Sequence, residues 1–191
     1  DLIDHLSTAK SPQQMFGAVV KTYYAQVAGV DPKDIVSVSI MPCTAKKFEA
    51  QRPEFNSSGY RDVDVVLTTR ELGRMIQEAG LDFPELEDSE FDNPLGVATG
   101  AGVIFGTTGG VMEAALRTVV EVLTEKPLER VVFQEVRGQS AVKEAILNVA
   151  GMDVKIAVVN TLKEARKMLD KVRAGKADYH FIEVMSCPDG C

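Results

Sequence analysis

The sequence predicts an α/β protein in which a mixed sheet is flanked by helices. Short apolar segments of strand length alternate along the chain with longer amphipathic segments of helical period, a pattern typical of this class. Hydrophobic residues make up 45% of the chain and charged residues 26%, as in ordinary globular domains. A length of 191 residues allows a sizeable core, and we expect residues 1–191 to form a single piece of one domain.

The first half of the chain carries clear helix signals. Ser11 suits a helix N-cap, Pro12 suits the first helical position, and Gly29 follows the end of the apolar pattern. Thr69 is the expected cap of a later helix, and Gly80 is its expected stop. In order, we expect a helix over residues 12–27, a strand over 35–40, a short helix over 44–51, a strand over 63–67 and a helix over 70–79.

The second half opens with two segments of irregular composition. Residues 81–93 are acidic and contain proline, which favours a surface loop with one helical turn at most. Residues 100–110 are rich in glycine. Gly151 and its neighbours predict the turn of a hairpin. We expect helices over residues 111–124 and 162–173, and strands over 131–136, 146–149, 154–159 and 179–184.

The charge balance argues against a nucleic-acid partner. The formal net charge is −7 at pH 7, whereas nucleic-acid surfaces need clustered lysine and arginine. No apolar run approaches the ~18 residues of a membrane span, so no membrane span is expected. No signal peptide is visible in the first residues. We expect the cytoplasm as the compartment, with the periplasm as the alternative.

The chain has three cysteines, Cys43, Cys187 and Cys191. An odd number in a chain of this size argues against a disulfide framework. The last nine residues, EVMSCPDGC, place two of the cysteines at a C-x-x-x-C spacing around a proline and a glycine. Thiolates ligate zinc and iron–sulfur clusters, although structural zinc favours C-x-x-C pairs. Spacing alone leaves a metal site and a thiol-bearing loop without metal as alternatives. Both cysteine segments follow a predicted strand, where sites form in α/β sheets.

Two further segments are candidates for ligand binding. Lys46 follows Cys43 by three residues, so both point to the same side of a helical turn. A lysine there lowers the pKa of a thiol or donates to an anionic ligand, and the alternative is a solvated lysine on a short helix. The glycines of residues 100–110 precede a helix, as in anion sites, but they form neither a P-loop nor a dinucleotide fingerprint.

Together these segments resemble the catalytic domain of iron-only ([FeFe]) hydrogenases. MPCTAKKFEA is similar to the family's second signature, M-P-C-x-x-K-x-x-E, and EVMSCPDGC is similar to the start of its third, E-x-M-x-C-x-x-x-C. LSTAKSPQQMFG and FGTTGGVMEAALR also resemble family segments, so the resemblance covers essentially the whole chain. It implies that the α/β fold is part of that catalytic domain. The second signature is matched at Met41, Pro42, Cys43, Lys46 and Glu49.

The resemblance implies an H-cluster, in which a [4Fe-4S] cluster joins a diiron subcluster that carries CO, cyanide and a dithiolate. Cys43 and Cys187 would ligate the [4Fe-4S] cluster, and Cys191 would ligate it and bridge to the diiron subcluster. Lys46 would donate a hydrogen bond to a cyanide, and Ser7 matches a hydroxyl of the family's proton relay. The implied reaction is the reversible formation of H2 from protons and electrons.

The resemblance also implies the walls of the cofactor pocket. Met41 and Met185 would pack around the diiron subcluster, and Phe105 would wall it. For such apolar residues the alternative is ordinary core packing. Gln13 would approach the subcluster from the helix that starts at Ser11, and both residues are assigned to the pocket.

The family's first signature, T-S-C-C-P, and the glycine-rich end of the third are absent from the 191 residues. We therefore expect an interior piece of a longer hydrogenase. Its remainder would supply one more cluster ligand and the cysteine that passes protons to the diiron centre, so the piece alone is expected to be inactive. The expected partners are this remainder and an electron carrier such as ferredoxin or NAD-linked subunits.

The alternative function is a non-catalytic iron–sulfur assembly or sensor protein that shares the domain. Lys46, together with Met41 and Met185, favours the enzyme, because a protein that holds only a [4Fe-4S] cluster needs no donor to cyanide. A zinc-binding or metal-free α/β interaction domain is a third class, and it requires the resemblance to be accidental.

Overall fold

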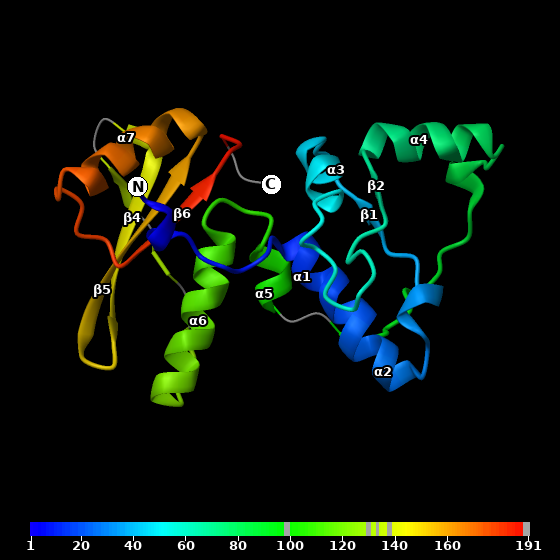
Figure 1. Ribbon diagram of the computed structural model, residues 1–191, viewed down its shortest axis with the longest axis horizontal. Coiled ribbons are helices and arrows are strands. Elements are labelled where there is room, and N and C mark those ends of the chain that lie inside the picture. The colour runs from blue at the N-terminus through cyan, green and yellow to red at the C-terminus, as the bar shows by residue number, and fades with distance from the viewer. Residues whose placement is uncertain (98–99, 129–130, 133, 137–138, 189–191) are drawn as a thin grey trace. The chain divides into compact units, whose positions relative to one another are not determined.

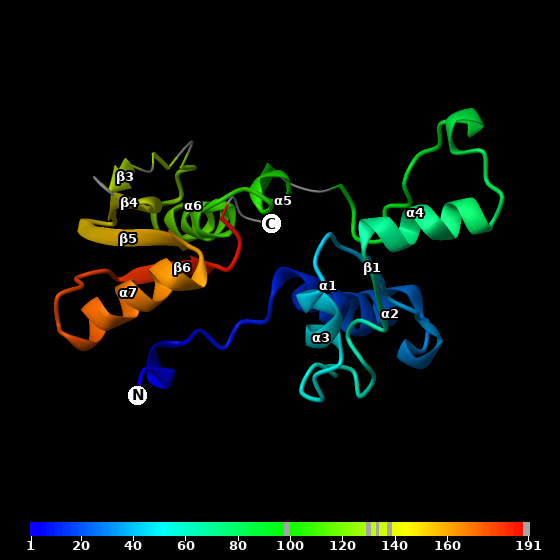
Figure 2. The ribbon, with the colours of Figure 1, turned by 90° about the horizontal axis from the view of Figure 1, so that it is seen from above.

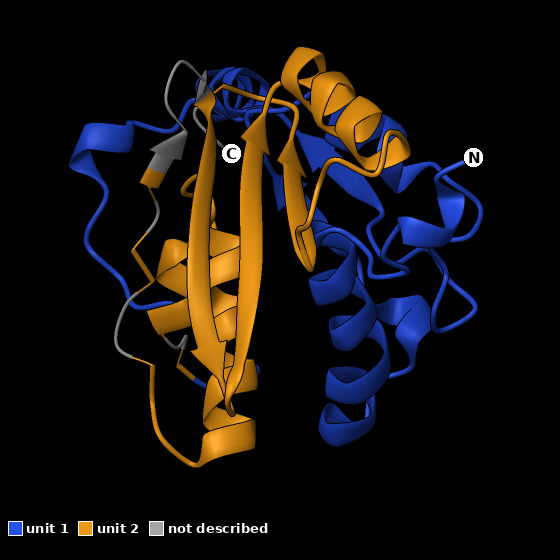
Figure 3. Ribbon diagram, turned by 90° about the vertical axis from the view of Figure 1, so that its left-hand side faces the viewer, with its two compact units in different colours: residues 1–96 blue, residues 97–191 orange. Residues whose placement is uncertain are grey.

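The computed structural model describes residues 1–97, 100–128, 131–132, 134–136 and 139–188 (Figure 1). The chain divides into two compact units, residues 1–96 and residues 97–191 (Figure 3). Both units combine helices with a sheet, and the sheet of the second unit is mixed, which confirms the predicted class. That residues 1–191 are one piece of a single domain stays a prediction. Within the described ranges no helix has the length and apolar character needed to cross a membrane.

The first long helix begins where the sequence predicts. Ser11 is the N-cap of α1 (Pro12–Val19), with its Oγ 3.4 Å from a backbone nitrogen of the first turn. The helical run then passes through a π-helical turn, η2 (Val20–Tyr24), into α2 (Ala25–Ala28). Gly29 ends the run with a φ of +67°, a value that glycine adopts at little cost. The π-helical turn is a feature that the sequence did not predict.

A two-stranded parallel sheet forms the centre of the first unit. Strand β1 (Val38–Ile40) pairs with β2 (Val65–Leu67), with Val38 opposite Val65. Both strands are shorter than predicted. Before β1, the Ile35 N–H donates to the loop carbonyl of Pro32, and Ser37 accepts from both Asp64 and Val65, which breaks the regular strand pairing. The connection between them contains α3 (Ala45–Ala50), the predicted short helix.

Helix α4 (Thr69–Glu78) begins one residue earlier than predicted. Its N-cap is Thr68, so the prediction of Thr69 as the cap is wrong. Thr68 Oγ1 accepts the Glu71 N–H at 3.3 Å, and the Glu71 carboxylate accepts the Thr68 N–H at 2.8 Å. This reciprocal capping box needs a glutamate three residues after the cap, which only Thr68 has. Gly80 follows the helix end as predicted, with a φ of +67°.

Two ion pairs connect the first helical run, and the residue before its N-cap, to the segment before β2. Lys10 Nζ lies 2.6 Å from the fully buried carboxylate of Asp62. Lys21 Nζ, itself buried, lies 2.6 Å from the carboxylate of Asp64, which also accepts the Ser37 N–H at 2.7 Å. Removing one partner of a buried pair costs about 3–5 kcal/mol. These pairs therefore fix how the helical run packs in the first unit.

The second unit holds a four-stranded sheet in the order β3-β4-β5-β6. The first three strands are antiparallel neighbours, and β6 joins β5 in parallel. The β4–β5 hairpin is predicted correctly, but β4 begins at Gln139 rather than at residue 146. Its first half contains Lys143 and Glu144, and pairing with β5 outweighs their low strand propensity. The strands are β3 (Gln134–Val136), β4 (Gln139–Val149), β5 (Met152–Asn160) and β6 (Phe181–Met185).

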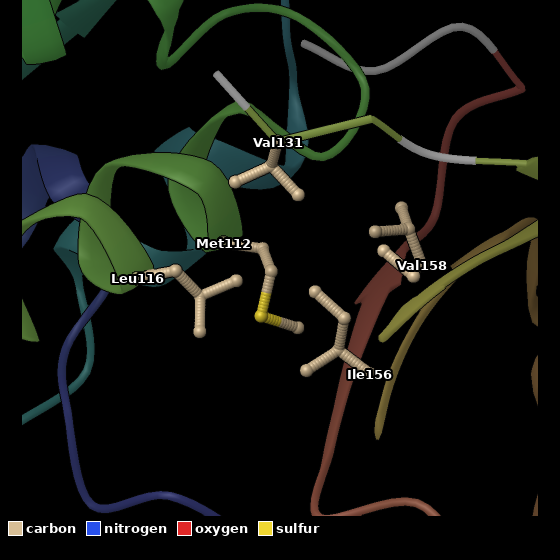
Figure 4. Close-up of a cluster of buried hydrophobic side chains, with 6 residues drawn as sticks. Met112, Leu116, Val131, Ile156 and Val158 are labelled. Atoms are coloured by element: carbon tan, nitrogen blue, oxygen red, sulfur yellow. The ribbon is translucent and has the colours of Figure 1, made fainter. Parts of the chain in front are cut away.

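Alternate residues of β5 face two separate cores, one with α6 (Gly110–Thr124) and one with α7 (Leu162–Arg173). The two helices therefore cover opposite faces of the sheet (Figure 2). A strand segment that is buried on both faces is a continuous apolar run, as the stretch from Ile156 to Val159 of β5 is. The bounds of α7 are those predicted, and α6 begins one residue early. The first core contains Met112, Leu116, Val131, Ala145, Ile156 and Val158 (Figure 4), and the second contains Val142, Ala157, Val159, Ala165 and Met168.

The remaining elements are short. One helical turn lies in the predicted surface loop, and one short helix lies in the glycine-rich segment. The predicted strand over residues 131–136 is observed only as β3, and residue 133 lies outside the described part. The short helical elements not yet described are η1 (Ile3–His5), η3 (Pro32–Asp34), η4 (Phe83–Glu85) and α5 (Gly100–Ile104).

We expect Gly17→Ala to destabilise the protein and Gly73→Ala to stabilise it. Both glycines lie inside helices. A Cβ at residue 17 would lie 2.4 Å from the Asp62 carbonyl oxygen and 2.9 Å from a Val63 methyl group, and such overpacking costs about 1–3 kcal/mol. Nothing lies within 4 Å of a Cβ at residue 73, so alanine there gains about 0.5–1 kcal/mol of helix propensity. Urea denaturation measures both, and an unchanged midpoint for G17A would contradict this packing of α1.

Candidate metal centre

Both cysteine segments follow the carboxyl end of a strand that belongs to a parallel pair, as predicted. Cys43 comes three residues after the end of β1, and Cys187 comes two residues after the end of β6. Both are free thiols, and Cys43 is half-buried whereas Cys187 is exposed. Ligand sites of α/β sheets form at such strand ends. Both thiols therefore lie just past strand ends, and their role as ligands stays a prediction.

A tight turn presents Cys43. The Met41 N–H extends the sheet by donating to the Leu67 carbonyl at 2.9 Å, and the Cys43 N–H donates to the Met41 carbonyl at 2.7 Å. Pro42, between them, has a φ restricted by its ring. The backbone thus reverses directly after the strand, with Met41 half-buried, and α3 begins two residues after the thiol.

Lys46 lies on α3, and most of its side chain is shielded from solvent. The side chain is 21% exposed, and Nζ lies 3.0 Å from Glu49 Oε2. Within the described part of the chain, Glu49 is the single hydrogen-bond partner of this ammonium. An ammonium has three N–H donors. Two donors are therefore left for a ligand.

The Glu49 carboxylate brings three predicted site residues together. Its Oε2 accepts from Ser11 Oγ at 2.9 Å, from Lys46 Nζ at 3.0 Å and from Gln13 Nε2 at 3.4 Å. The second signature contains Glu49, but the family resemblance implies no role for it in the pocket. Its spacing of three residues from Lys46 is the local signal that could have identified it. Its contacts with Ser11 and Gln13 span 38 and 36 residues and have no local signal.

Two buried glutamines lie in the first turn of α1. Gln13 is 8% exposed, and its Oε1 accepts from Ser39 Oγ at 2.7 Å. Gln14 is fully buried, and neither its Nε2 nor its Oε1 has a partner in the described part of the chain. A buried polar group without a partner costs about 1–3 kcal/mol. A polar partner at this place would therefore be stabilising.

In the second unit, Glu183 fastens β6 to the start of α6. Its Oε2 accepts the Met112 N–H at 2.8 Å, in the first turn of α6. The positive end of a helix favours a carboxylate. Its Oε1 is buried and has no hydrogen-bond partner among the residues that the structure describes. Burial raises the pKa of Glu183, and the backbone N–H groups near the carboxylate at Met112 and Gly109 oppose this shift only in part.

The end of β6 is held by a strained residue that follows β5. The Thr161 N–H donates to the Met185 carbonyl at 2.7 Å, and Thr161 has a φ of +71°, which is rare for a β-branched residue. Asn160, which is opposite Met185 in the register, is 4% exposed, and its Oδ1 has no partner among the described side chains and backbone. Strain and unpaired polar groups concentrate at functional sites. Both support a functional role for this strand end.

The other predicted site residues are placed separately. Phe105 follows α5 in the second unit and is half-buried. Ser7 is exposed, and its Oγ accepts the Ala9 N–H at 3.1 Å. Cys191 lies outside the described residues. Among the residues that are described, no three His, Cys, Asp or Glu side chains gather as a metal site. The roles assigned to these residues stay predictions.

The whole chain, residues 1–191, matches a family model described as "Iron only hydrogenase large subunit, C-terminal domain". The chain belongs to this hydrogenase family. The large subunit of a periplasmic [Fe] hydrogenase from Nitratidesulfovibrio vulgaris is 53% identical over 191 residues, which are 100% of this chain and 45% of the relative. Iron hydrogenase 1 of Clostridium pasteurianum is 47% identical over 100% of this chain and 33% of its own length.

Solved structures show the same fold. An apo [FeFe]-hydrogenase from Chlamydomonas reinhardtii matches with a TM-score of 0.82 and 43% identity, over 100% of this chain and 55% of that chain. This confirms that the mixed α/β arrangement is that of the iron-only hydrogenase domain. The hydrogenase-family chain spans about half the length of the Nitratidesulfovibrio relative and of this solved chain. Cytosolic iron–sulfur assembly component 3 of Mus musculus is 33% identical over 195 aligned residues, covering 100% of this chain and 41% of the relative.

We expect Glu183→Gln to change how the stability of this hydrogenase-family protein depends on pH. Because burial raises the folded-state pKa of Glu183 above its ordinary value of 4.5, the fold favours the protonated carboxyl. This contribution is complete below pH 4.5 and is lost as the pH rises through the folded-state pKa. The glutamine variant does not titrate at this position, so it does not lose this contribution. The free energy of unfolding of the variant minus that of the wild type should therefore increase as the pH rises from about 4 to about 7.

Urea denaturation at several pH values in this range measures the difference between the E183Q variant and the wild type. A difference that stays constant with pH would contradict the burial of Glu183.

Proposed function

We propose that the chain forms part of an [FeFe] hydrogenase, which converts two protons and two electrons reversibly into H2. The observation that carries the proposal is the Cys43 thiol past the end of β1 with the Lys46 ammonium three residues later on α3. A thiol alone suits many metal sites, whereas a thiol with a cation three residues later suits a metal that carries an anionic ligand. Membership of the hydrogenase family over the whole chain supports the same function.

The thiols suit the [4Fe-4S] part of an H-cluster. Cys43 and Cys187 are free, and iron–sulfur clusters take thiolate ligands. Cys191, outside the described residues, is proposed as a third ligand and as the bridge to the diiron subcluster. A [4Fe-4S] cluster takes four thiolates, and the chain has three cysteines. The fourth ligand is therefore expected from elsewhere in the complete protein, and the isolated chain is not expected to sustain H2 turnover.

Lys46 is the proposed donor to the cyanide ligands of the diiron subcluster. Within the described part of the chain, two of its three N–H donors have no partner. The ammonium is partly withdrawn from water, where a charge-assisted hydrogen bond is stronger than in bulk solvent. When bound, the H-cluster would supply the redox-active metal atoms for the chemistry of H2, and the proposed electron carrier would supply the electrons.

Apolar and polar side chains complete the proposed pocket. Met41, Met185 and Phe105 are half-buried, and we assign them to surround the diiron subcluster and to exclude water from it. Gln13 is assigned to face the pocket from α1. The exposed hydroxyl of Ser7 is assigned to hold and pass a proton in a relay.

The proposed partners are the rest of the hydrogenase chain and an electron carrier. The sequence spans 45% of the Nitratidesulfovibrio relative, which supports the first partner. A subunit of an NADP-reducing hydrogenase from Solidesulfovibrio fructosivorans is 51% identical over all of this chain. This likeness supports nicotinamide-linked subunits as electron partners, and ferredoxin is the other proposed carrier. The cytoplasm stays the proposed compartment.

An iron–sulfur assembly protein is the second candidate function. It is supported by 33% identity with the assembly component of Mus musculus. Identities of 53% and 47% with hydrogenases favour the enzyme. Lys46 marks the chemical difference, because a protein that holds only a [4Fe-4S] cluster has no cyanide for the ammonium to bind.

Substituting Lys46 tests the proposed function. K46M keeps the apolar stem of the side chain but removes the ammonium, so we expect H2 evolution by the complete, cluster-loaded protein to fall about 10- to 100-fold. K47M is the matched control, because Lys47 lies on the same helix and pairs with Glu71 at 2.7 Å. Gas chromatography under anaerobic conditions, with a reduced dye as electron donor, measures the rate. Unchanged activity in K46M, or no H2 from the wild type, would count against the proposal.

A further inference from the structure

We propose that Glu49 is a positioning residue of the site, whose carboxylate sets the direction in which Lys46 presents its ammonium to the cofactor. This inference rests on the proposed function. The second signature alone places Glu49 three residues after Lys46 and does not distinguish a positioning role from a solvated helix pair. The contacts of the carboxylate with another helix make the distinction.

One oxygen of Glu49 is the meeting point of side chains from two helices. Oε2 accepts from Lys46 Nζ at 3.0 Å, and from Ser11 Oγ at 2.9 Å and Gln13 Nε2 at 3.4 Å. Lys46 belongs to α3, whereas Ser11 and Gln13 lie at the start of α1. The carboxylate therefore ties the two helices together at residues that are assigned to the pocket.

The contacts from α1 restrain the carboxylate itself. In an ordinary exposed pair on one helix, both long side chains move, and the pair contributes little. Here Ser11 and Gln13 hold Oε2 from a second helix, and the Glu49 side chain is only 20% exposed. Lysine has a flexible four-carbon stem. A fixed carboxylate at its tip removes much of that freedom before any ligand binds.

The orientation of Gln13 makes it a donor to Glu49. Its Oε1 accepts from Ser39 Oγ at 2.7 Å, and its Nε2 lies 3.4 Å from Glu49 Oε2 and 3.5 Å from the Lys46 carbonyl oxygen. A reversed amide would turn its oxygen toward two acceptors, so one orientation is favoured. A chain of hydrogen bonds thus runs from β1 through α1 to the carboxylate on α3.

The neighbouring ion pair provides a contrast. Lys47 Nζ lies 2.7 Å from Glu71, with side chains that are 35% and 36% exposed, and Glu71 caps α4. The contacts of the Glu71 carboxylate therefore stabilise the first turn of α4. The Lys46–Glu49 pair is less exposed and shares its carboxylate with two residues assigned to the pocket. The two pairs have similar distances and different surroundings, which makes Glu71 a matched control.

Infrared spectroscopy of the complete, cluster-loaded protein tests the proposal through the C≡N stretching bands, which respond to hydrogen bonds at the cyanide nitrogen. E49Q keeps the size of the side chain and removes its charge, so we expect shifted and broadened bands and about 10- to 100-fold less H2 evolution. E49D retains a carboxylate and should lie closer to the wild type. E71Q should leave the bands unchanged, because glutamine still forms a capping box.

A double substitution separates positioning from a general structural effect. If Glu49 acts through Lys46, E49Q should cause no further change of the bands in a K46M background. Wild-type bands in E49Q, equal shifts in E49Q and E71Q, or an undiminished effect of E49Q in the K46M background would each overturn the proposal. Absence of any C≡N band from the wild-type protein would instead overturn the proposed function, and this inference with it.

Discussion

The candidate site depends on two backbone hydrogen bonds, one in each unit. Each bond forms where two parallel strands end, and each holds the methionine that precedes a cysteine segment, Met41 or Met185. The Met41 N–H donates to the carbonyl of Leu67 at the end of β2, and the Thr161 N–H donates to the carbonyl of Met185 at the end of β6. Strands of a parallel pair end at the same edge of a sheet. The segments that carry the thiols therefore leave the sheets at fixed points, and the cores of each unit hold these points in place.

Each unit supports its cysteine segment with a carboxylate that belongs to the same signature. Glu49 accepts from side chains, namely a hydroxyl, an amide and an ammonium. Glu183 accepts the backbone N–H of Met112 at the start of α6. Neither glutamate is a predicted cluster ligand. Each signature therefore contains a carboxylate that holds the cysteine segment as well as the cysteine itself. In the first unit Glu49 orders three side chains, and in the second unit Glu183 binds the start of α6 to β6.

The parts of the structure with local signals could be predicted from the sequence. The bounds of α7 follow from its helical period, and the start of α1 follows from Ser11 and the proline after it. Two adjacent threonines suit the cap of α4, and only the reciprocal bond with Glu71 selects Thr68. The first half of β4 depends on pairing with β5, and the π-helical turn η2 has no local signal. In the site, the spacing of Lys46 from Cys43 predicts a lysine near a thiol, which stays a prediction. The contacts of Glu49 with Ser11 and Gln13 of the first helical segment require the tertiary fold.

Anomalous X-ray diffraction at the iron absorption edge is the most direct test that these strand ends hold an H-cluster. It requires oxygen-free crystals of the complete, cluster-loaded protein. Iron peaks are predicted beside Sγ of Cys43 and Cys187, with a separate pair of iron atoms close to Lys46 Nζ. Zinc at the cysteines, no metal, or an iron–sulfur cluster without the pair of iron atoms would contradict the assignment.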